Sequence, residues 1–354
     1  MGTQRSLLSL PIDDLDRILY AVGPRWERLR EQRLLLTGGT GFIGKWLLAT
    51  FLHANRKLGL SAHIVVLSRR SEKFIEEFPE LRSASEITWL CGDVRDMAPN
   101  AAGNCNFAIH AATDVVAQSP PAEILDTCIG GTRRVLDSMV GNAAACRVLL
   151  VSSGAIYGLT PAGITVISEE YSGAPDPLVS DSAYGEGKRI SEILCAIAAS
   201  ERYSLEVSIA RCFAFVGPHL PLDKHFAIGN FIGAAMRGDD ICVQGDGTPV
   251  RSYLYAADLA HWLWVMLFDA PSGRAYNVGG TEALSIGDLA HRVNSLLGGK
   301  GKVNIAKAPL PHATPQTYVP SVERIAVELG LVPSIGLDEA ILRTARWAQH
   351  AIQD

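Results

Sequence analysis

The chain has 354 residues, of which 48% are hydrophobic and 19% are charged, so it can bury a sizeable core and is not a disordered protein. Its net charge of −5 argues against a nucleic-acid-binding surface, and no apolar run reaches the roughly 18 to 20 residues of a membrane-spanning helix. Acidic residues near the N-terminus (Asp13, Asp14 and Asp16) and seven cysteines without a CxxC pair predict a cytoplasmic protein with free thiols and no metal site.

The predicted elements begin with residues 1–30, a helical pattern that we expect to pack outside a sheet or at a subunit contact. Short apolar runs then alternate with helical patterns. The runs are expected to be strands: Leu34–Leu36, Ile64–Leu67, Ile87–Leu90, Phe107–Ile109, Val148–Val151 and Val207–Ala210. Near-continuous apolar strands separated by helices predict an α/β protein with a Rossmann-type, doubly wound parallel sheet, whose ligand lies at the carboxyl ends of the strands.

The turn after the first strand is rich in glycine. Gly38, Gly41 and Gly44 recur every three residues, where a backbone can turn tightly and approach a ligand without Cβ atoms in the way. A predicted helix follows at residues 45–52, and its N-terminal amides and positive dipole end suit a pyrophosphate. The strand–turn–helix context is the one that a dinucleotide-binding fingerprint requires, although such a turn can also be purely structural.

A second signal lies between Tyr184 and Lys188, which are four residues apart and share one face of a predicted helix. The lysine ammonium can lower the pKa of the phenol, which would let Tyr184 act as general acid or base for an alcohol–ketone pair. Ser152 and Ser153 end a predicted strand upstream, and a serine hydroxyl there would bind the same oxygen. A YxxxK spacing alone is typical of many surface helices, but the glycine-rich turn and the serine strand favour the catalytic interpretation.

Prolines interrupt the pattern beyond about residue 212. We expect a dinucleotide-binding domain at residues 31–211, to which residues 252–280 return. Residues 212–251 and 281–354 would form a smaller, mixed α/β C-terminal lobe that binds the substrate.

Nine motifs occur in order after residue 33. They are TGGTGFIG (37–44), GDVRD (92–96), HAAT (110–113), GGT (130–132), SSGAIYG (152–158), YGEGK (184–188), RCFAFVGP (211–218), GDGTPVRSYLYAADLA (245–260) and YNVGG (276–280). With them the chain resembles the extended short-chain dehydrogenases/reductases of the nucleotide-sugar epimerase/dehydratase family. The resemblance implies a nicotinamide dinucleotide cofactor and a nucleotide-diphosphate sugar substrate.

The resemblance also implies roles for individual residues. Ser153, Tyr184 and Lys188 would be catalytic. The cofactor would contact Gly38, Thr40, Gly41, Phe42, Ile43, Gly44, Ser68, Arg69, Arg70, Asp93, Val94, Ala111, Ala112, Thr113, Ser152, Tyr184 and Lys188. The substrate would contact Thr113, Ser153, Gly154, Ala155, Tyr184, Asn230 and Arg251, the last two at its diphosphate. A guanidinium binds phosphate in a bidentate manner, although Arg251 could instead form a surface ion pair.

Three features depart from the family pattern. NAD-preferring relatives have an acidic residue at the Ser68 position, so a hydroxyl followed by Arg69 and Arg70 favours NADP(H) over NAD(H), unless these arginines are only a solvated strand end. The 4,6-dehydratases carry Asp-Glu where this chain has Gly154 and Ala155, and the decarboxylases also need the glutamate. Dehydration and decarboxylation are therefore disfavoured. Cys128 replaces a family asparagine and is expected to be a buried packing thiol.

The sequence predicts an NADP(H)-dependent enzyme that exchanges a hydride with C4 of the sugar. We expect it to be a 4-ketoreductase that makes a 6-deoxy sugar nucleotide. The main alternative is a 4-epimerase that returns the hydride to the other face of the sugar. A reductase of a non-nucleotide ketone or aldehyde and a non-catalytic NADP-sensing protein are further alternatives. The resemblance also implies a homodimer.

Overall fold

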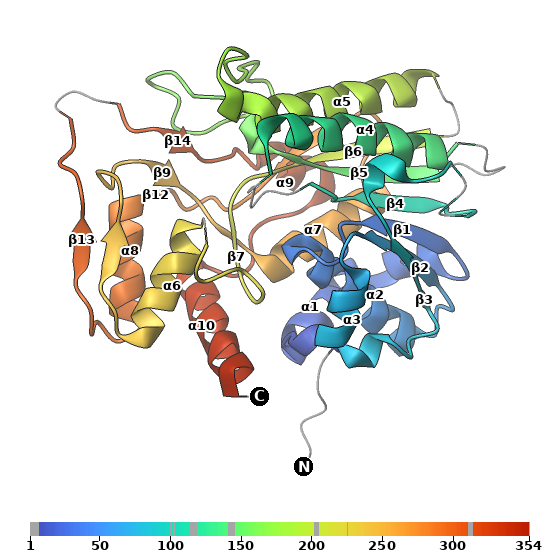
Figure 1. Ribbon diagram of the computed structural model, residues 1–354, viewed down its shortest axis with the longest axis horizontal. Coiled ribbons are helices and arrows are strands. Elements are labelled where there is room, and N and C mark those ends of the chain that lie inside the picture. Colours follow the sequence, from blue (N-terminus) through green and yellow to red (C-terminus); the bar gives the residue numbers. More distant parts are fainter. Residues whose placement is uncertain are drawn as a thin grey trace. The chain divides into compact units, whose positions relative to one another are not determined.

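The computed structural model describes residues 7–99, 101, 103–113, 119–140, 146–201, 205–224, 226–310 and 314–353 (Figure 1). The chain forms two compact units. The first contains Met1–Gly158, Ala174–Arg211 and Ala260–Tyr276, and the second contains Leu159–Gly173, Cys212–Leu259 and Asn277–Asp354. Each unit is therefore assembled from three separate segments of the chain. None of the helices in the described ranges combines the length and the apolar character that crossing a membrane requires.

A seven-stranded sheet forms the centre of the first unit, in the order β11-β6-β5-β4-β1-β2-β3. Its strands are β1 (Arg33–Thr37), β2 (His63–Ser68), β3 (Ile87–Cys91), β4 (Phe107–His110), β5 (Cys146–Ser153), β6 (Leu205–Cys212) and β11 (Ala275–Val278). The pairing is parallel, with Leu36 beside Val66 on β2 and Ile109 on β4. The strand order reverses between β1 and β4, which creates the switch point where such sheets bind ligands. The predicted doubly wound parallel sheet is confirmed.

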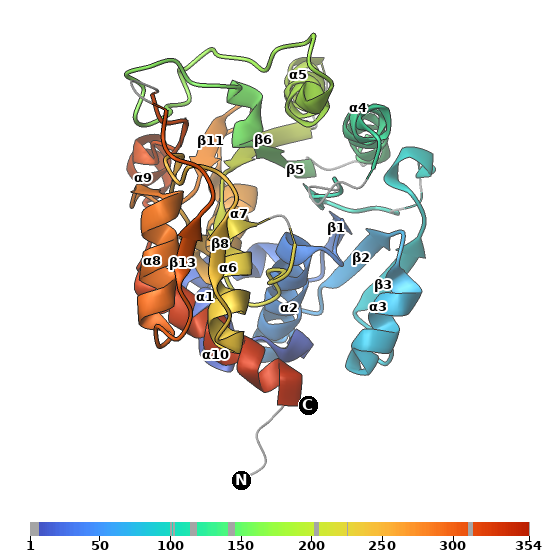
Figure 2. The ribbon, with the colours of Figure 1, turned by 60° about the vertical axis from the view of Figure 1, so that its left-hand side comes forward.

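Helices cover both faces of this sheet (Figures 1 and 2). One face carries α4 (Pro121–Ser138) and α5 (Ala183–Glu201). The opposite face carries α1 (Ile12–Val22), α2 (Phe42–Leu58), α3 (Ser71–Glu77) and α7 (Ala256–Asp269). In β1 and β2 every residue after the first is buried, which explains why these strands read as continuous apolar runs.

Short 3-10 helices connect several of these elements. They are η1 (Leu7–Ser9), η2 (Gly23–Leu29), η3 (Pro79–Leu81), η4 (Val94–Asp96), η5 (Gly154–Tyr157) and η6 (Ser180–Ser182). In η2, the ring of Trp26 lies 4.8 Å from that of Trp264 and 6.0 Å from that of Phe268, both on α7. Arg25 adds an ion pair to Asp269 at 2.5 Å. The described part of the N-terminal extension thus packs onto α7.

The second unit is a mixed α/β structure with three small sheets, ordered β10-β7, β12-β9-β14 and β13-β8. Its strands are β7 (Phe215–Val216), β8 (Ile241–Val243), β9 (Val250–Arg251), β10 (Leu254–Tyr255), β12 (Leu284–Ser285), β13 (Val303–Ile305) and β14 (Thr317–Tyr318). Its helices are α6 (Ala227–Arg237), α8 (Ile286–Leu296), α9 (Glu323–Leu329) and α10 (Leu337–Gln353). Asn277 ties the segment Leu159–Gly173 into this unit, because its amide Nδ2 donates to Ile167 O at 2.9 Å.

Candidate active site and cofactor pocket

The glycine-rich turn between β1 and α2 packs directly against the end of β4. Gly38 has a φ of 72°, and a Cβ there would lie 2.6 Å from Ala111 O. A Cβ on Gly44 would lie 2.2 Å from Gly38 O. Both positions therefore require glycine. The N-cap residue of α2, Gly41, has no side chain to cap the helix, so the first amides of α2 can bind an anion.

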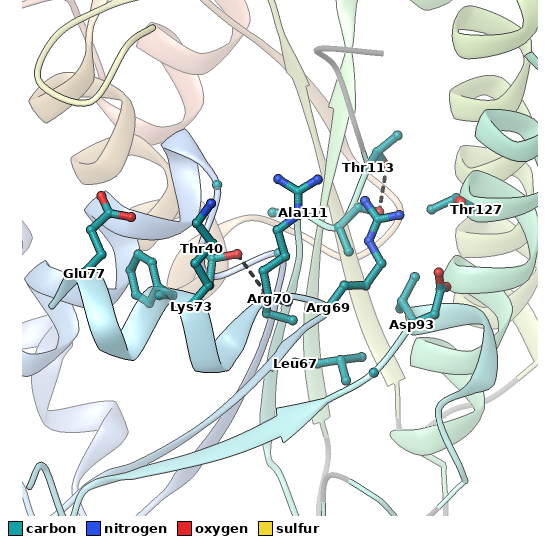
Figure 3. Close-up of a pocket in the computed structure, with 17 residues that line it drawn as sticks. Thr40, Leu67, Arg69, Arg70, Lys73, Glu77, Asp93, Ala111, Thr113 and Thr127 are labelled. Atoms are coloured by element: carbon teal, nitrogen blue, oxygen red, sulfur yellow. Dashed lines mark hydrogen bonds between the residues drawn. The ribbon is translucent and has the colours of Figure 1, made fainter. Parts of the chain in front are cut away.

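A pocket of about 400 Å³ opens beside this turn (Figure 3). It is lined by Gly38, Thr40, Gly41, Leu67, Ser68, Arg69, Arg70, Lys73, Phe74, Glu77, Gly92, Asp93, Val94, Ala111, Ala112, Thr113 and Thr127. Eleven of the predicted cofactor residues lie in it, and the glycine cradle and strand ends fit a nicotinamide dinucleotide. Predicted residues Phe42, Ile43, Gly44, Ser152, Tyr184 and Lys188 do not line this pocket.

Sequence reasoning missed the contribution of α3 to the pocket. Lys73, Phe74 and Glu77 line it directly after the arginine pair. Arg70, Lys73, Phe74 and Glu77 follow helical spacing, with steps of three and four residues, so they share one face. This spacing is the signal that could have identified them.

Hydroxyl groups connect the glycine-rich turn to the end of β2. Thr40 Oγ1 lies 2.8 Å from Ser68 Oγ, which also accepts a hydrogen bond from Arg70 N at 3.1 Å. Arg69 and Arg70 are exposed, and Figure 3 shows their side chains extending next to each other on the pocket side of the strand end. The strand end therefore combines a hydroxyl with two cations.

The two acidic residues that line the pocket each have a cationic partner. Glu77 lies 3.5 Å from Lys45 Nζ. Asp93 accepts two hydrogen bonds from the Arg95 side chain, at 2.9 and 2.8 Å, and these bonds hold the pKa of Asp93 below its usual range. Because both carboxylates are paired, the charges of the pocket favour an anionic ligand.

The predicted catalytic residues lie on two neighbouring elements, β5 and α5. Lys188 is only 4% exposed, and its Nζ donates to Val151 O at 2.7 Å. Ser153, at the end of β5, is buried, and its Oγ accepts from Ala155 N at 3.1 Å. A Cβ on Gly185 would lie 2.7 Å from Ala155 O, so the first turn of α5, which carries the half-buried Tyr184, lies close to η5.

Two further buried residues lie near Lys188. His110 ends β4, and its Nδ1 is 2.7 Å from Thr37 Oγ1. Burial, with a smaller contribution from the Lys188 charge, lowers the pKa of His110 to about 3, so this imidazole is neutral at physiological pH. Burial raises the pKa of the Cys128 thiol, and a Cβ on Gly187 would lie 2.9 Å from Cys128 Cβ. Cys128, on α4, therefore packs tightly against α5.

The predicted diphosphate ligands belong to the second unit. Asn230 is exposed on α6. Arg251 is half-buried on β9, and its Nη1 donates to Val250 O at 2.9 Å and to Gln316 O at 3.2 Å. Its guanidinium carbon also lies 5.5 Å from the centre of the Tyr318 ring. These contacts hold Arg251 in a fixed orientation.

Comparison with known proteins identifies the family. Residues 34–279, which make up more than half of the chain, match the model of the NAD dependent epimerase/dehydratase family. The chain belongs to this family. UDP-glucuronic acid decarboxylase 1 of Xenopus tropicalis is 26% identical over 356 residues, covering 97% of this chain and 79% of that protein.

Solved structures share the epimerase/dehydratase fold. A UDP-glucose 4-epimerase from Thermotoga maritima, solved with UDP-glucose, superposes with a TM-score of 0.75 at 20% identity, over 91% of this chain and all of that chain (100%). A dTDP-glucose 4,6-dehydratase from Streptomyces venezuelae, solved with NAD, gives 0.72 at 24% identity, over 90% of this chain and 97% of that chain. Neither structure bears on the predicted preference for NADP(H), which stays a prediction.

The comparisons overturn one prediction. The sequence disfavoured dehydration and decarboxylation because Gly154 and Ala155 carry no carboxyl group, yet similar proteins include a UDP-glucuronic acid decarboxylase and a 4,6-dehydratase. The absence of carboxyl groups at residues 154 and 155 is therefore a wrong criterion for judging these two reactions. Once C4 of a hexuronate is a ketone, its carboxylate is β to that ketone. The electrons of the C5–C6 bond can then move into the carbonyl as CO₂ leaves, without an acid at residue 154 or 155.

Proposed function

We propose that the protein exchanges a hydride between a nicotinamide dinucleotide and C4 of a nucleotide-diphosphate sugar. The observation that carries this proposal is the buried Lys188, whose hydrogen bond to Val151 O joins the YxxxK helix to the strand that ends at Ser153. When bound, the nicotinamide supplies the hydride acceptor or donor. Tyr184 moves the matching proton, Ser153 orients the sugar oxygen, and Lys188 stabilises the phenolate.

The proposal assigns the substrate's diphosphate to Arg251 and Asn230 and makes the second unit the substrate-binding lobe. Arg251 supports this assignment because Val250 O, Gln316 O and the Tyr318 ring orient its guanidinium. Thr113, Gly154 and Ala155 would contact the sugar. We place the protein in the cytoplasm, where its cysteines stay reduced.

Two net reactions follow from the same C4 chemistry, and each has one observation in its favour. The arginine pair at the end of β2 suits NADPH, which favours reduction of a 4-keto-6-deoxy sugar nucleotide to a 6-deoxy sugar nucleotide. The similarity to a UDP-glucuronic acid decarboxylase over 97% of the chain favours decarboxylation of a UDP-hexuronate through a 4-keto acid.

One assay separates these reactions. The purified protein is incubated either with NADPH and 4-keto-6-deoxy nucleotide sugars or with NAD and UDP-glucuronic acid, and cofactor absorbance, CO₂ and sugar products are measured. Stoichiometric NADPH loss identifies a ketoreductase, and CO₂ release identifies a decarboxylase. A product epimeric at C4 without net cofactor loss identifies a 4-epimerase. No conversion of any nucleotide sugar would contradict the proposal.

Replacement of Tyr184 tests the mechanism. Tyr184→Phe should abolish turnover, because the phenyl ring cannot transfer a proton, while the Kd for the cofactor stays within about twofold. Tyr20→Phe, at an exposed tyrosine on α1, is the matched control and should leave turnover unchanged. Full activity of the Tyr184→Phe protein would contradict the assigned role.

The preference for NADP(H) is tested by binding. We expect the protein to bind NADPH at least about tenfold more tightly than NADH, because the 2′-phosphate would lie between Arg69 and Arg70. Ser68→Asp should reverse the preference by repelling that phosphate. Arg70→Ser should weaken NADPH alone, whereas Arg82→Ser, at an exposed arginine outside the pocket, should change neither affinity. Equal affinities of the native protein for both cofactors would contradict the preference.

A further inference from the structure

A hydrogen-bonded network lies at the carboxyl end of β5. Ser152 Oγ donates to Glu192 Oε1 at 2.6 Å. Arg211, near the end of β6, donates two hydrogen bonds to the same carboxylate. Its Nε lies 3.1 Å from Oε1, and its Nη2 lies 2.8 Å from Oε2. Its Nη1 donates to Tyr157 Oη at 2.8 Å. We call these four residues the β5–α5 clamp.

The β5–α5 clamp is largely removed from solvent. The side chains of Arg211 and Glu192 are 16% and 11% exposed, and the guanidinium carbon lies 5.2 Å from the centre of the Tyr157 ring. An ion pair in such surroundings loses about as much hydration energy as it gains from attraction, so its contribution to stability is small. Its fixed geometry, with a planar fork on a carboxylate, suits a positioning role better than a stabilising one.

The geometry links two consecutive residues of β5 to two consecutive turns of α5. Val151 O accepts from Lys188 Nζ, and Ser152 Oγ donates to Glu192, four residues further along the helix. Tyr184, Lys188 and Glu192 are spaced by four residues and share one helix face. Ser153 follows Ser152 directly. The clamp therefore determines where the Ser153 end of β5 sits along the face of α5 that carries Tyr184.

We infer that Glu192 is a positioning residue. Arg211 holds the Glu192 carboxylate in place, and this carboxylate binds Ser152 and so keeps the neighbouring Ser153 in register with Tyr184 and Lys188. This inference rests on the proposed function, because that function makes these three residues the catalytic group. Nothing else in the described chain links the Ser152 side chain to α5. Loss of the Ser152 hydroxyl would leave the Arg211–Glu192–Tyr157 contacts intact and remove only the side-chain link between Ser152 and α5.

The chain offers a matched pair of serines for the test. Ser152 and Ser191 are both buried, and Ser191 lies on α5 next to Glu192. The Ser191 hydroxyl donates to Cys128 O at 2.9 Å, toward α4 instead of β5. Ser152→Ala and Ser191→Ala therefore remove one buried hydroxyl each, the first bonded to Glu192 and the second to α4, and Ser152→Thr retains the hydroxyl.

The full-length variants are compared in the sugar assay, with kcat, the KM for the sugar and cofactor Kd measured across pH. We expect Ser152→Ala to lower kcat by about tenfold while KM and Kd change by less than about twofold, since misplaced catalytic groups lose rate before binding. Ser152→Thr should restore kcat. Ser191→Ala should keep kcat while losing a similar amount of thermal stability. Equal kcat values for the two alanine variants would overturn the inference.

A second measurement needs no sugar and so separates failure of the inference from failure of the proposed function. Phenolate absorbance of the cofactor-bound protein is titrated with pH, with and without Tyr184→Phe, to isolate Tyr184. In the Ser152→Ala background the Tyr184 phenol should ionise at higher pH, because the Ser153 hydroxyl is no longer positioned to donate a hydrogen bond to the phenolate. In the Ser191→Ala background it should be unchanged. An unaltered titration in the Ser152→Ala protein would overturn the inference even if no nucleotide sugar is converted.

Discussion

At the scale of single residues, burial decides whether a group beside Lys188 is charged. Lys188 is held against β5 by its hydrogen bond to Val151 O. His110 lies buried nearby, and its Nδ1 is hydrogen-bonded to Thr37 Oγ1. A second cation in that space would repel the ammonium. The protein avoids this repulsion by keeping the imidazole neutral, as the proposed action of Lys188 on Tyr184 requires.

The neutral His110 makes stability depend on pH. Its pKa is about 3 in the folded protein, below the ordinary 6.5, so the unfolded chain binds a proton that the folded protein does not. The contribution of the neutral imidazole to the free energy of unfolding is complete above about pH 6.5. It is lost as the pH falls toward 3, by at most ~1.4 kcal/mol per pH unit. His110→Gln should therefore lose less stability than the native protein between about pH 6.5 and pH 4 in urea unfolding.

The exposed His350 on α10 provides the control for this measurement. His350→Gln should reproduce the native pH dependence, because this substitution leaves the buried imidazole of His110 in place. If His110→Gln and the native protein lost equal stability over this range, another group would be responsible.

Residues of the site differ in how well the sequence predicts them. The glycines of the turn were predictable because their spacing reflects a local backbone requirement, and Gly38 and Gly44 indeed have no room for a Cβ. Lys73 and Glu77 were missed because a helix face reaches the pocket only through tertiary packing. The reasoning from Gly154 and Ala155 failed for a chemical reason, since two missing carboxyl groups do not define a reaction.

At the scale of elements, the N-terminal extension belongs to the helical layer of the sheet. The buried Trp26 of η2 contacts the rings of Trp264 and Phe268 on α7. Trp264 Nε1 in turn donates to Thr50 Oγ1 on α2 at 2.8 Å. These contacts connect η2, α7 and α2.

Removal of the Trp26 ring should be severely destabilising. Trp26→Ala would leave a cavity among these rings and should lower the free energy of unfolding by about 3 to 5 kcal/mol. Tyr20→Ala, at a 79% exposed aromatic residue of the same segment, should change it by less than about 0.5 kcal/mol. Urea unfolding at constant pH measures both, and similar losses for the two variants would show that the extension is only loosely attached.

The strands of the main sheet were predicted well because strands buried on both faces are short, apolar and bounded by polar turns. The edge strand β11 was not predicted as a strand, since its four residues include the polar Asn277. The small sheets of the second unit were missed as well. Strands such as β9 and β14 have two residues each, too few to show any periodicity.

At the scale of the whole molecule, the chain passes repeatedly from one unit to the other. Residues Ala260–Tyr276 bring most of α7 and the start of β11 back to the first unit after Cys212–Leu259 has been built into the second. A chain that ends at residue 211 therefore lacks an edge strand and the aromatic partners of Trp26. We expect it to aggregate or to show no cooperative thermal unfolding by circular dichroism, whereas the full chain should unfold cooperatively. A cooperative transition in the shortened chain would contradict this interpretation.

The path between Ser153 and Tyr184 has a consequence for the order of folding. Both residues belong to the first unit, but the chain that joins them passes through Leu159–Gly173, which Asn277 ties into the second unit. Asn277 follows Ser153 by more than a hundred residues, so closing this contact is entropically costly and slow. This connection is therefore expected to be fixed late, after most of the polypeptide has left the ribosome, and the proposed catalytic residues at its two ends would be held in their final places only then.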